Sequence, residues 1–374
     1  MKTKAAVLNE MGLPRPYAQS RPLSIVEIDL DPPGPGEVLV RMRAAGLCHS
    51  DLSVINGDRP RPLPMVIGHE GAGEVAEVGA GVRDLKPGDH VVAAFVPCCG
   101  TCEPCTGGRP YLCEPGFKAN TAGVLLSGAR RMHAGAQLIN HHLGVSAYAD
   151  YSIMVRQSLV KVEIGLSFDE AAVFGCAVMT GVGAVTNTVH PASGSSIAVV
   201  GLGGVGLAAL LGARTIDGAT IVACDISDEK LALARELGAT HTVNASAADA
   251  VERVKDLTRG GVHYAFEMAG SVKAMELAYK ITRRGGTTVT AGLPNPQHLF
   301  SIPQVGLVAE ERTVKGSYLG SCDPARDIPR YVGMYRAGKL PIDRLLSERL
   351  PLEDINSGFD RLADGKTVRQ IVKF

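Results

Sequence analysis

The chain shows two different patterns of hydrophobic and polar residues, one in its first part and one in its second. In roughly the first 150 residues, short β-branched runs alternate partly with polar residues and end at Gly or Pro, as in 37–46 (EVLVRMRAAG), 73–81 (GEVAEVGAG) and 88–96 (GDHVVAAFV). From residue 196 onward, apolar strands alternate with helical segments, beginning with SIAVVG, LAALLGARTI and TIVACD. The first pattern predicts an irregular β-rich region. The second predicts right-handed βαβ units around a parallel sheet, so the fold class is α/β.

A long apolar segment precedes the alternating region. Residues 168–189 lack Pro and are rich in Ala, Val and Met, which predicts a buried helix. Ser167 supplies an N-cap, and Asp169 and Glu170 supply an acidic first turn. Beyond residue 321, a Pro-flanked helix candidate is followed by a final apolar strand, TVRQIVKF.

Length and charge narrow the possible classes of protein. The 374 residues are enough for two domains of ordinary size. Hydrophobic residues make up 45%, charged residues 20%, and the formal net charge is zero, which gives no electrostatic reason to expect nucleic acid or a membrane surface as a partner. The N-terminus has no apolar run of signal-peptide length, and no stretch approaches the ~18 uninterrupted apolar residues of a spanning helix. We therefore expect a cytoplasmic protein, whose nine cysteines serve metal binding or catalysis instead of disulfides.

A glycine-rich turn follows the strand SIAVV and opens a helix. Its glycines permit a tight turn, close approach of a pyrophosphate and packing of helix on strand, and the helix N-terminus offers N–H groups to phosphates. Asp225 ends the next strand, where a carboxylate accepts from ribose hydroxyls and repels a 2′-phosphate, so NAD is favoured over NADP. Lys230 could reach the same ribose. The alternative is a strand–turn–helix without a nucleotide. The predicted cofactor-binding turn consists of Gly201, Gly203, Gly204, Val205 and Gly206.

Four cysteines lie close together in a Gly- and Pro-rich loop, namely Cys99, Cys102, Cys105 and Cys113. Four thiolates can surround Zn²⁺ tetrahedrally and leave no position for a substrate, which predicts a structural zinc. A four-cysteine iron–sulfur cluster is the alternative. Cys98 adjoins the first of these thiols, and the sequence leaves open whether it is unliganded or an alternative ligand.

Three further motifs carry a family resemblance, together with the four-cysteine loop. They are Cys48-His49-Ser50-Asp51, Gly68-His69-Glu70-x₂-Gly73, and Gly175-Cys176-x₃-Thr180-Gly181. In combination they resemble the medium-chain zinc-dependent alcohol dehydrogenases, and most of all the long-chain branch that includes the class III enzymes. The resemblance runs nearly end to end. It implies a GroES-like distorted β-barrel catalytic domain, residues 1–177 and 321–374, and a Rossmann doubly wound parallel-sheet domain, residues 178–320.

The resemblance also implies a catalytic metal centre. Cys48, His69 and Cys176 would ligate a zinc whose fourth position takes water or the substrate oxygen. This Cys₂His set is the one that alcohol dehydrogenases are known to use, so it comes from the resemblance and the spacing alone does not predict it. Asp51 and Glu70 would be outer groups that orient His69 and the metal. With the four-cysteine site, each chain would hold two zinc ions.

The proton path is expected to begin at a side chain beside the first zinc ligand. Ser50 resembles the family's Ser or Thr that takes the alcohol proton and passes it through the ribose hydroxyl. Many relatives carry a histidine three residues later, where this chain has Ser53, so the outer end of the relay differs.

Cofactor and pocket residues follow from the same resemblance. His49 and Arg369 would approach the pyrophosphate, and Thr180 the nicotinamide ring. An apolar pocket would be lined by Phe95, Leu143 and Leu319. Arg59 and His142 replace residues that are often apolar, and would favour a substrate with a polar or acidic group; a solvated loop is the alternative reading.

The predicted function is hydride transfer between a primary alcohol or aldehyde and NAD. The alternative within enzymes is a glutathione-dependent formaldehyde (S-hydroxymethylglutathione) dehydrogenase, although the loop SVINGDRPRPLP lacks the Ala-Asp-Pro-Glu run of that class. A non-catalytic nicotinamide-binding protein is a remote alternative. Family members pair through the edge strand of the nucleotide domain, here around residues 312–318, so a homodimer is expected, with a tetramer as the alternative.

Overall fold

A computed structural model describes residues 1–374. The chain forms two compact units. The first comprises Met1–Cys176, Asp323–Val332 and Leu346–Phe374, and the second comprises Ala177–Cys322 and Gly333–Leu345. Their limits lie near the predicted domain boundaries, but the second unit also takes in residues 333–345.

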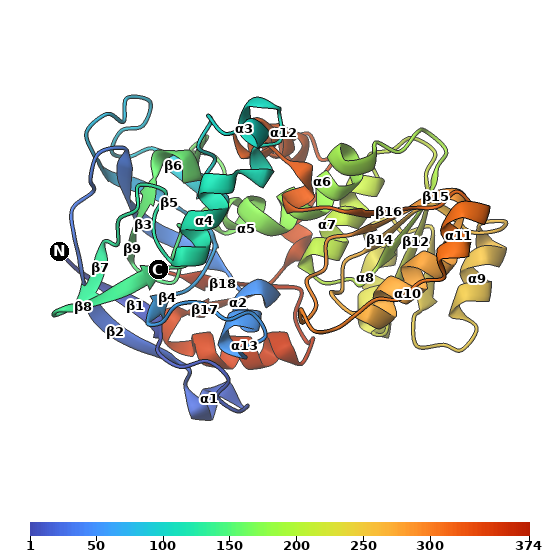
Figure 1. Ribbon diagram of the computed structural model, residues 1–374, viewed down its shortest axis with the longest axis horizontal. Helices are drawn as coiled ribbons and strands as arrows, with labels where there is room; N and C mark the ends of the chain where they lie inside the picture. The colour runs from blue at the N-terminus through green and yellow to red at the C-terminus, as the bar shows by residue number, and fades with distance from the viewer. The chain divides into compact units, whose positions relative to one another are not determined.

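The first unit is built from two β structures (Figure 1). One is a closed barrel of strands in the order β1-β2-β7-β8-β4, and the other is a sheet in the order β10-β6-β5-β3-β18-β17, with β9 also paired to β3. The strands are β1 (Lys2–Leu8), β2 (Leu23–Leu30), β3 (Glu37–Gly46), β4 (Met65–Val66), β5 (Glu70–Val78), β6 (His90–Ala93), β7 (Met132–Ala134), β8 (Gln137–His141), β9 (Tyr151–Val155), β10 (Leu159–Val162), β17 (Leu346–Pro351) and β18 (Arg369–Lys373). This confirms the predicted irregular β region.

Short helices join these strands. The α-helices are α1 (Tyr17–Ser20), α2 (His49–Ile55), α3 (Glu103–Thr106), α4 (Glu114–Ala122), α5 (Phe168–Val173), α12 (Pro324–Arg336) and α13 (Ile355–Ala363). Single 3₁₀ turns are η1 (Pro110–Leu112), η2 (Arg156–Ser158) and η7 (Leu352–Asp354). The final residues of α12 belong to the second unit.

The second unit is a parallel sheet in the order β13-β12-β11-β14-β15-β16 (Figure 1). This is the strand order of a Rossmann fold, 3-2-1-4-5-6, so the predicted doubly wound domain is confirmed. Its strands are β11 (Ser196–Val200), β12 (Thr220–Asp225), β13 (His241–Asn244), β14 (Val262–Glu267), β15 (Thr282–Thr290) and β16 (Thr313–Gly316). Its helices are α6 (Met179–Gly183), α7 (Gly204–Ala213), α8 (Asp228–Glu236), α9 (Ala250–Leu257), α10 (Val272–Ile281) and α11 (Gln304–Ala309), with 3₁₀ turns η5 (Leu319–Ser321) and η6 (Ile342–Leu345).

The apolar segment 168–189 is one helix with two wide turns. α5 begins with a reciprocal capping box between Ser167 and Glu170, as its sequence predicts. The π-helical turns η3 (Phe174–Val178) and η4 (Ala184–Val189) flank α6. The helix has the length and hydropathy of a membrane span, but 83% of its most apolar window is buried inside the protein. Such burial is typical of a core helix.

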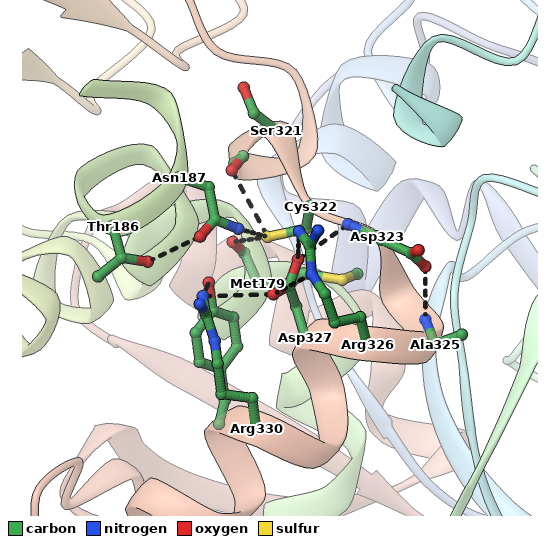
Figure 2. A network of polar contacts seen from close by, with 12 residues as sticks. Met179, Thr186, Asn187, Ser321, Cys322, Asp323, Ala325, Arg326, Asp327 and Arg330 are labelled. Carbon is green, nitrogen blue, oxygen red and sulfur yellow. Dashed lines mark hydrogen bonds and ion pairs between the residues drawn. The ribbon is translucent and has the colours of Figure 1, made fainter. Parts of the chain in front are cut away.

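A tight turn follows the last strand of the second unit. The Cys322 thiol donates to the Met179 carbonyl oxygen at 3.3 Å and accepts from the Asn187 amide at 3.2 Å (Figure 2). Gly320, at φ 63°, lies so close to the core helix that a Cβ there would be 2.3 Å from the same carbonyl. These contacts fix η5 and the buried side chain of Leu319.

A buried carboxylate ties β3 to two loops of the first unit. Glu37 accepts from Arg131 Nε at 2.7 Å, from the Ser127 hydroxyl at 2.7 Å and from the Gly34 amide at 2.8 Å. Burial alone would raise the pKa of Glu37, but these donors together lower it below 4.5. β3 runs directly toward the Cys48 motif, so this anchor supports the strand that carries it.

We predict that Glu37→Gln lowers the free energy of unfolding at pH 7 by about 2 kcal/mol, because it breaks a buried charge pair whose cation is partly exposed. The folded-state pKa of Glu37 is depressed, so its contribution is complete above pH 4.5 and is lost as the pH falls through that lower value. Urea unfolding at several pH values should show the difference shrinking in acid. The exposed Glu27→Gln is the control; an equal loss in both variants would contradict the prediction.

Candidate metal and nucleotide sites

Three residues far apart in sequence meet in the first unit. Cys48 immediately precedes α2, His69 immediately precedes β5, and Cys176 lies in the π-helical turn η3. Their ligand atoms, with a Glu70 oxygen, all lie within 4.8 Å of one another and are buried. Gly175 lets this turn approach β6, since a Cβ there would be 2.1 Å from the Ala93 carbonyl oxygen.

The spacing of these atoms fits a tetrahedral zinc. His69 Nε2 lies 3.3 Å from Cys176 Sγ, close to the roughly 3.6 Å that Zn–N and Zn–S bonds subtend in a tetrahedron. A hydrogen bond with Cys176 lowers the pKa of Cys48 well below its usual value and raises that of Cys176, so the two thiols hold one proton between them. Two buried sulfurs and an imidazole nitrogen form a donor set that suits Zn²⁺.

A buried carboxylate orients His69. Asp51 Oδ1 lies 2.8 Å from His69 Nδ1, and Asp51 Oδ2 accepts from the Tyr148 hydroxyl at 2.8 Å. Burial alone would raise the pKa of Asp51, but the neighbouring charge of His69 and hydrogen bonds lower it to about 2. The ionised carboxylate holds a proton of His69 on Nδ1 and directs Nε2 at the two thiols, where it becomes the metal-binding nitrogen once it loses its own proton.

Glu70 and Arg369 form a buried pair behind the ligands. Arg369 Nη1 donates to Glu70 Oε1 at 2.9 Å and to the Leu47 carbonyl oxygen at 2.8 Å. Glu70 Oε2 is buried and accepts no hydrogen bond. Burial raises the pKa of Glu70 to about 8, and Arg369 offsets only part of that rise. An unsatisfied buried acceptor beside two thiols and an imidazole is a further feature that suits a cation.

The four predicted structural ligands also converge. The sulfurs of Cys99 and Cys105 are 4.0 Å apart, and those of Cys102 and Cys113 are 3.9 Å apart, near the roughly 3.8 Å edge of a ZnS₄ tetrahedron. Cys98 lies outside this group, with its thiol 3.4 Å from two backbone carbonyl oxygens. Burial raises the pKa of Cys98 to about 12, which keeps it a neutral thiol.

The glycine-rich turn of the second unit has the geometry of a nucleotide cradle. A Cβ at Gly206 would be 1.8 Å from the Gly201 carbonyl oxygen, whereas a Cβ at Gly203 would meet no protein atom within 4 Å. The open position is therefore the second glycine, where a pyrophosphate approaches. Asp225 accepts from the backbone amides of Leu202 at 2.6 Å and Ser227 at 2.9 Å, so its carboxylate is fixed at the end of β12.

The remaining predicted cofactor residues lie in both units. His49 is exposed and Ser50 half-buried on the first turn of α2, in the first unit. Thr180 is buried in α6, and Lys230 is half-buried on α8, both in the second unit. Arg369, expected near the pyrophosphate, is 4% exposed and bonded to Glu70.

Some of the predicted pocket residues lie against the metal centre, and one lies in the loop that follows α2. The Phe95 ring meets the His69 ring edge-on at 5.4 Å, and His142 does so at 5.8 Å. Leu143 follows in a buried left-handed position. Arg59 is half-buried and its amide donates to the Ser53 carbonyl oxygen at the end of α2.

Known proteins share this arrangement along the whole chain. The family model "Alcohol dehydrogenase GroES-like domain" matches residues 34–164, and "Zinc-binding dehydrogenase" matches residues 204–335. An NDMA-dependent alcohol dehydrogenase from Amycolatopsis methanolica is 39% identical over 100% of this chain and 99% of its own length. An S-(hydroxymethyl)glutathione dehydrogenase from Photobacterium damsela subsp. piscicida is 37% identical over 100% of both chains. The crystal structure of benzyl alcohol dehydrogenase from Acinetobacter calcoaceticus superposes with a TM-score of 0.93, at 31% identity over 100% of this chain and 99% of that one.

The chain belongs to the zinc-dependent alcohol dehydrogenase family. The predicted family, fold class and enzyme class are confirmed: this alcohol dehydrogenase is an oxidoreductase that uses zinc and NAD. In this family member, Cys48, His69 and Cys176 would hold the catalytic zinc. The four-cysteine loop would hold the second zinc.

Sequence analysis missed two polar residues of these sites. Tyr148, which donates to Asp51, lies in a segment with no motif, so no local signal could have found it. Glu267, at the end of β14, accepts from the amides of Ala269 at 2.8 Å and Gly270 at 2.6 Å. Its position at the carboxyl end of a predicted parallel strand was the available signal.

We predict that Cys102→Ser lowers the zinc content by one ion per chain and lowers the melting temperature, because a structural zinc contributes directly to folding. Cys98→Ser should leave the zinc content unchanged. Elemental analysis of the purified variants, beside wild type, measures both. Zinc loss in Cys98→Ser with retention in Cys102→Ser would reverse the assignment.

Proposed function

We propose that this alcohol dehydrogenase transfers a hydride between a primary alcohol or aldehyde and NAD at the Cys48–His69–Cys176 centre. The observation that supports the proposal most is the convergence of two thiols and one oriented imidazole within 4.8 Å. In the oxidation direction, the carbinol carbon loses a hydride to C4 of the nicotinamide and the hydroxyl loses a proton, so the products are an aldehyde, NADH and H⁺.

A zinc ion bound there supplies Lewis acidity to the substrate oxygen. The protein's own groups do the rest. Asp51 keeps the His69 Nε2 lone pair available, and the Arg369–Glu70 pair places a positive charge beside the thiols. Ser50, two residues after Cys48, would take the proton of the alcohol hydroxyl while passing its own proton outward. The Phe95 ring packs edge-on against one side of His69.

We infer a preference for NAD over NADP from Asp225. Its carboxylate accepts from two backbone amides, which fix it at the end of β12, the point where the adenosine ribose would lie. A 2′-phosphate there would meet a negative charge.

The test combines metal analysis with an NADH absorbance assay over a panel of primary alcohols. Wild type should hold two zinc ions per chain and reduce NAD in preference to NADP. Cys176→Ala should retain one zinc and NAD binding, yet lose at least about 1000-fold in turnover, because several kcal/mol of transition-state stabilisation go with the catalytic metal. Cys224→Ala, a buried thiol of β12 apart from both clusters, is the control and should keep both zinc ions. Full activity in Cys176→Ala would refute the proposal.

A second candidate activity is oxidation of the glutathione adduct of formaldehyde. It is supported by the 37% identity to an S-(hydroxymethyl)glutathione dehydrogenase over the full length. Formaldehyde-dependent NAD reduction that requires added glutathione would establish it, and indifference to glutathione would exclude it.

We also propose a homodimer formed through β16. This strand ends the sheet order and all four of its residues are exposed. Apolar side chains surround it, with Val314 and Tyr318 each 39% exposed and Val308 78% exposed. Such an unprotected edge is a template for pairing with a second copy. Sedimentation should give twice the chain mass of 39.2 kDa, and Val314→Lys should shift the protein to monomers; a monomeric wild type would contradict this.

We place the reaction in the cytoplasm. All nine cysteines are free, and the six that gather in the two metal clusters are suited to a reducing compartment. Cell fractionation tests this placement.

A further inference from the structure

The Asp51 carboxylate lies close to a second histidine, His142, besides the predicted zinc ligand His69. His142 Nδ1 lies 3.3 Å from Asp51 Oδ1, the same oxygen that His69 Nδ1 approaches at 2.8 Å. Both imidazoles and the carboxylate are buried, with side-chain exposures of 2%, 1% and 0%. The His142 contact is the longer of the two, and it is a polar contact that falls short of hydrogen-bond geometry.

The backbone holds His142 firmly in this place. It directly follows β8, its amide donates to the Ser146 hydroxyl at 3.0 Å, and its carbonyl oxygen accepts from the amides of Val145 at 3.0 Å and Ser146 at 3.1 Å. These hydrogen bonds fix the backbone of His142 at the end of the barrel strand, and so limit where its side chain can lie. A carboxylate can only accept, so the ring nitrogen that faces Asp51 carries a proton.

We propose that His142 is a positioning residue for the catalytic metal centre, acting on the ligand His69 through the carboxylate that they share. Asp51 has three side-chain partners, His69, His142 and Tyr148, and no solvent contact to replace any of them. Loss of one donor leaves a buried anion under-satisfied and freer to rotate, which in turn loosens the orientation of the His69 ring. This inference rests on the proposed metal centre and adds a group to it.

Two substitutions separate the polar contact of His142 with Asp51 from its ring contact with His69. Phe95 already packs edge-on against His69, so His142→Phe can keep the same ring contact while removing the donor. His142→Asn keeps a side-chain N–H near the place of Nδ1 and removes the ring. His141→Asn is the control, because His141, the last residue of β8, is equally buried but accepts from the Arg131 amide and does not contact Asp51.

The readout is the rate at which the holoenzyme releases catalytic zinc to excess EDTA, with the visible spectrum of the cobalt-substituted enzyme as a second measure. His142→Phe should release zinc about 10- to 100-fold faster and shift the cobalt bands, as loss of an outer-sphere partner does. His142→Asn should stay near wild type, as should His141→Asn.

Three results would overturn the proposal: zinc release by His142→Phe at the wild-type rate, an equal effect of Phe and Asn, or an equal effect in the His141 control. A change confined to KM would make His142 a wall of the substrate pocket only. Thermal melting of each variant identifies a global loss of folding. A wild-type enzyme without catalytic zinc would refute the proposed function itself, whereas an active two-zinc wild type with an unaffected His142→Phe would refute this inference alone.

Discussion

The ionised carboxylate of Asp51 is the constraint on which the metal centre depends. A buried charge of this kind is costly unless several donors satisfy it, and here donors come from a loop, a barrel strand end and the residue before β5. Because those donors belong to separate segments, the carboxylate couples the local folds of α2, β5 and β8. As a result, the His69 ring is held in one orientation, with Nε2 toward the Cys48 and Cys176 sulfurs.

The buried Arg369–Glu70 pair is the second electrostatic feature of the metal centre. Arg369 belongs to the last strand of the chain, so β18 must pair with β3 before its guanidinium can reach Glu70. A buried salt bridge contributes little net stability, because desolvation offsets most of its attraction. Its value here is functional: it keeps a cation beside two sulfurs that must both be thiolates when a metal is bound. The same residue was expected to serve the nucleotide, and its contact with Glu70 adds a role within the first unit.

Helix geometry and glycine placement set the ligand positions. Cys176 lies in a π-helical turn. Such turns are rare in proteins overall, but those that occur are often at functional sites, because the wide turn changes the direction of one side chain without ending the helix. Gly175 permits that turn to touch β6. The long apolar helix is therefore shaped by the site as well as by the core that buries it.

The sequence alone determined the features whose geometry spans a short stretch of chain. The strands of the Rossmann sheet, the glycine-rich turn with Asp225, the capped helix at Ser167 and the four-cysteine loop each follow from spacing over a few residues, where backbone geometry allows few arrangements. Resemblance alone joined Cys48, His69 and Cys176, since Cys176 is 107 positions from His69. Tertiary structure decided which polar groups share the buried carboxylate, and it excluded Cys98 from the cluster. Those partners depend on the packing of whole segments against one another, and that packing is encoded in no local pattern of residues.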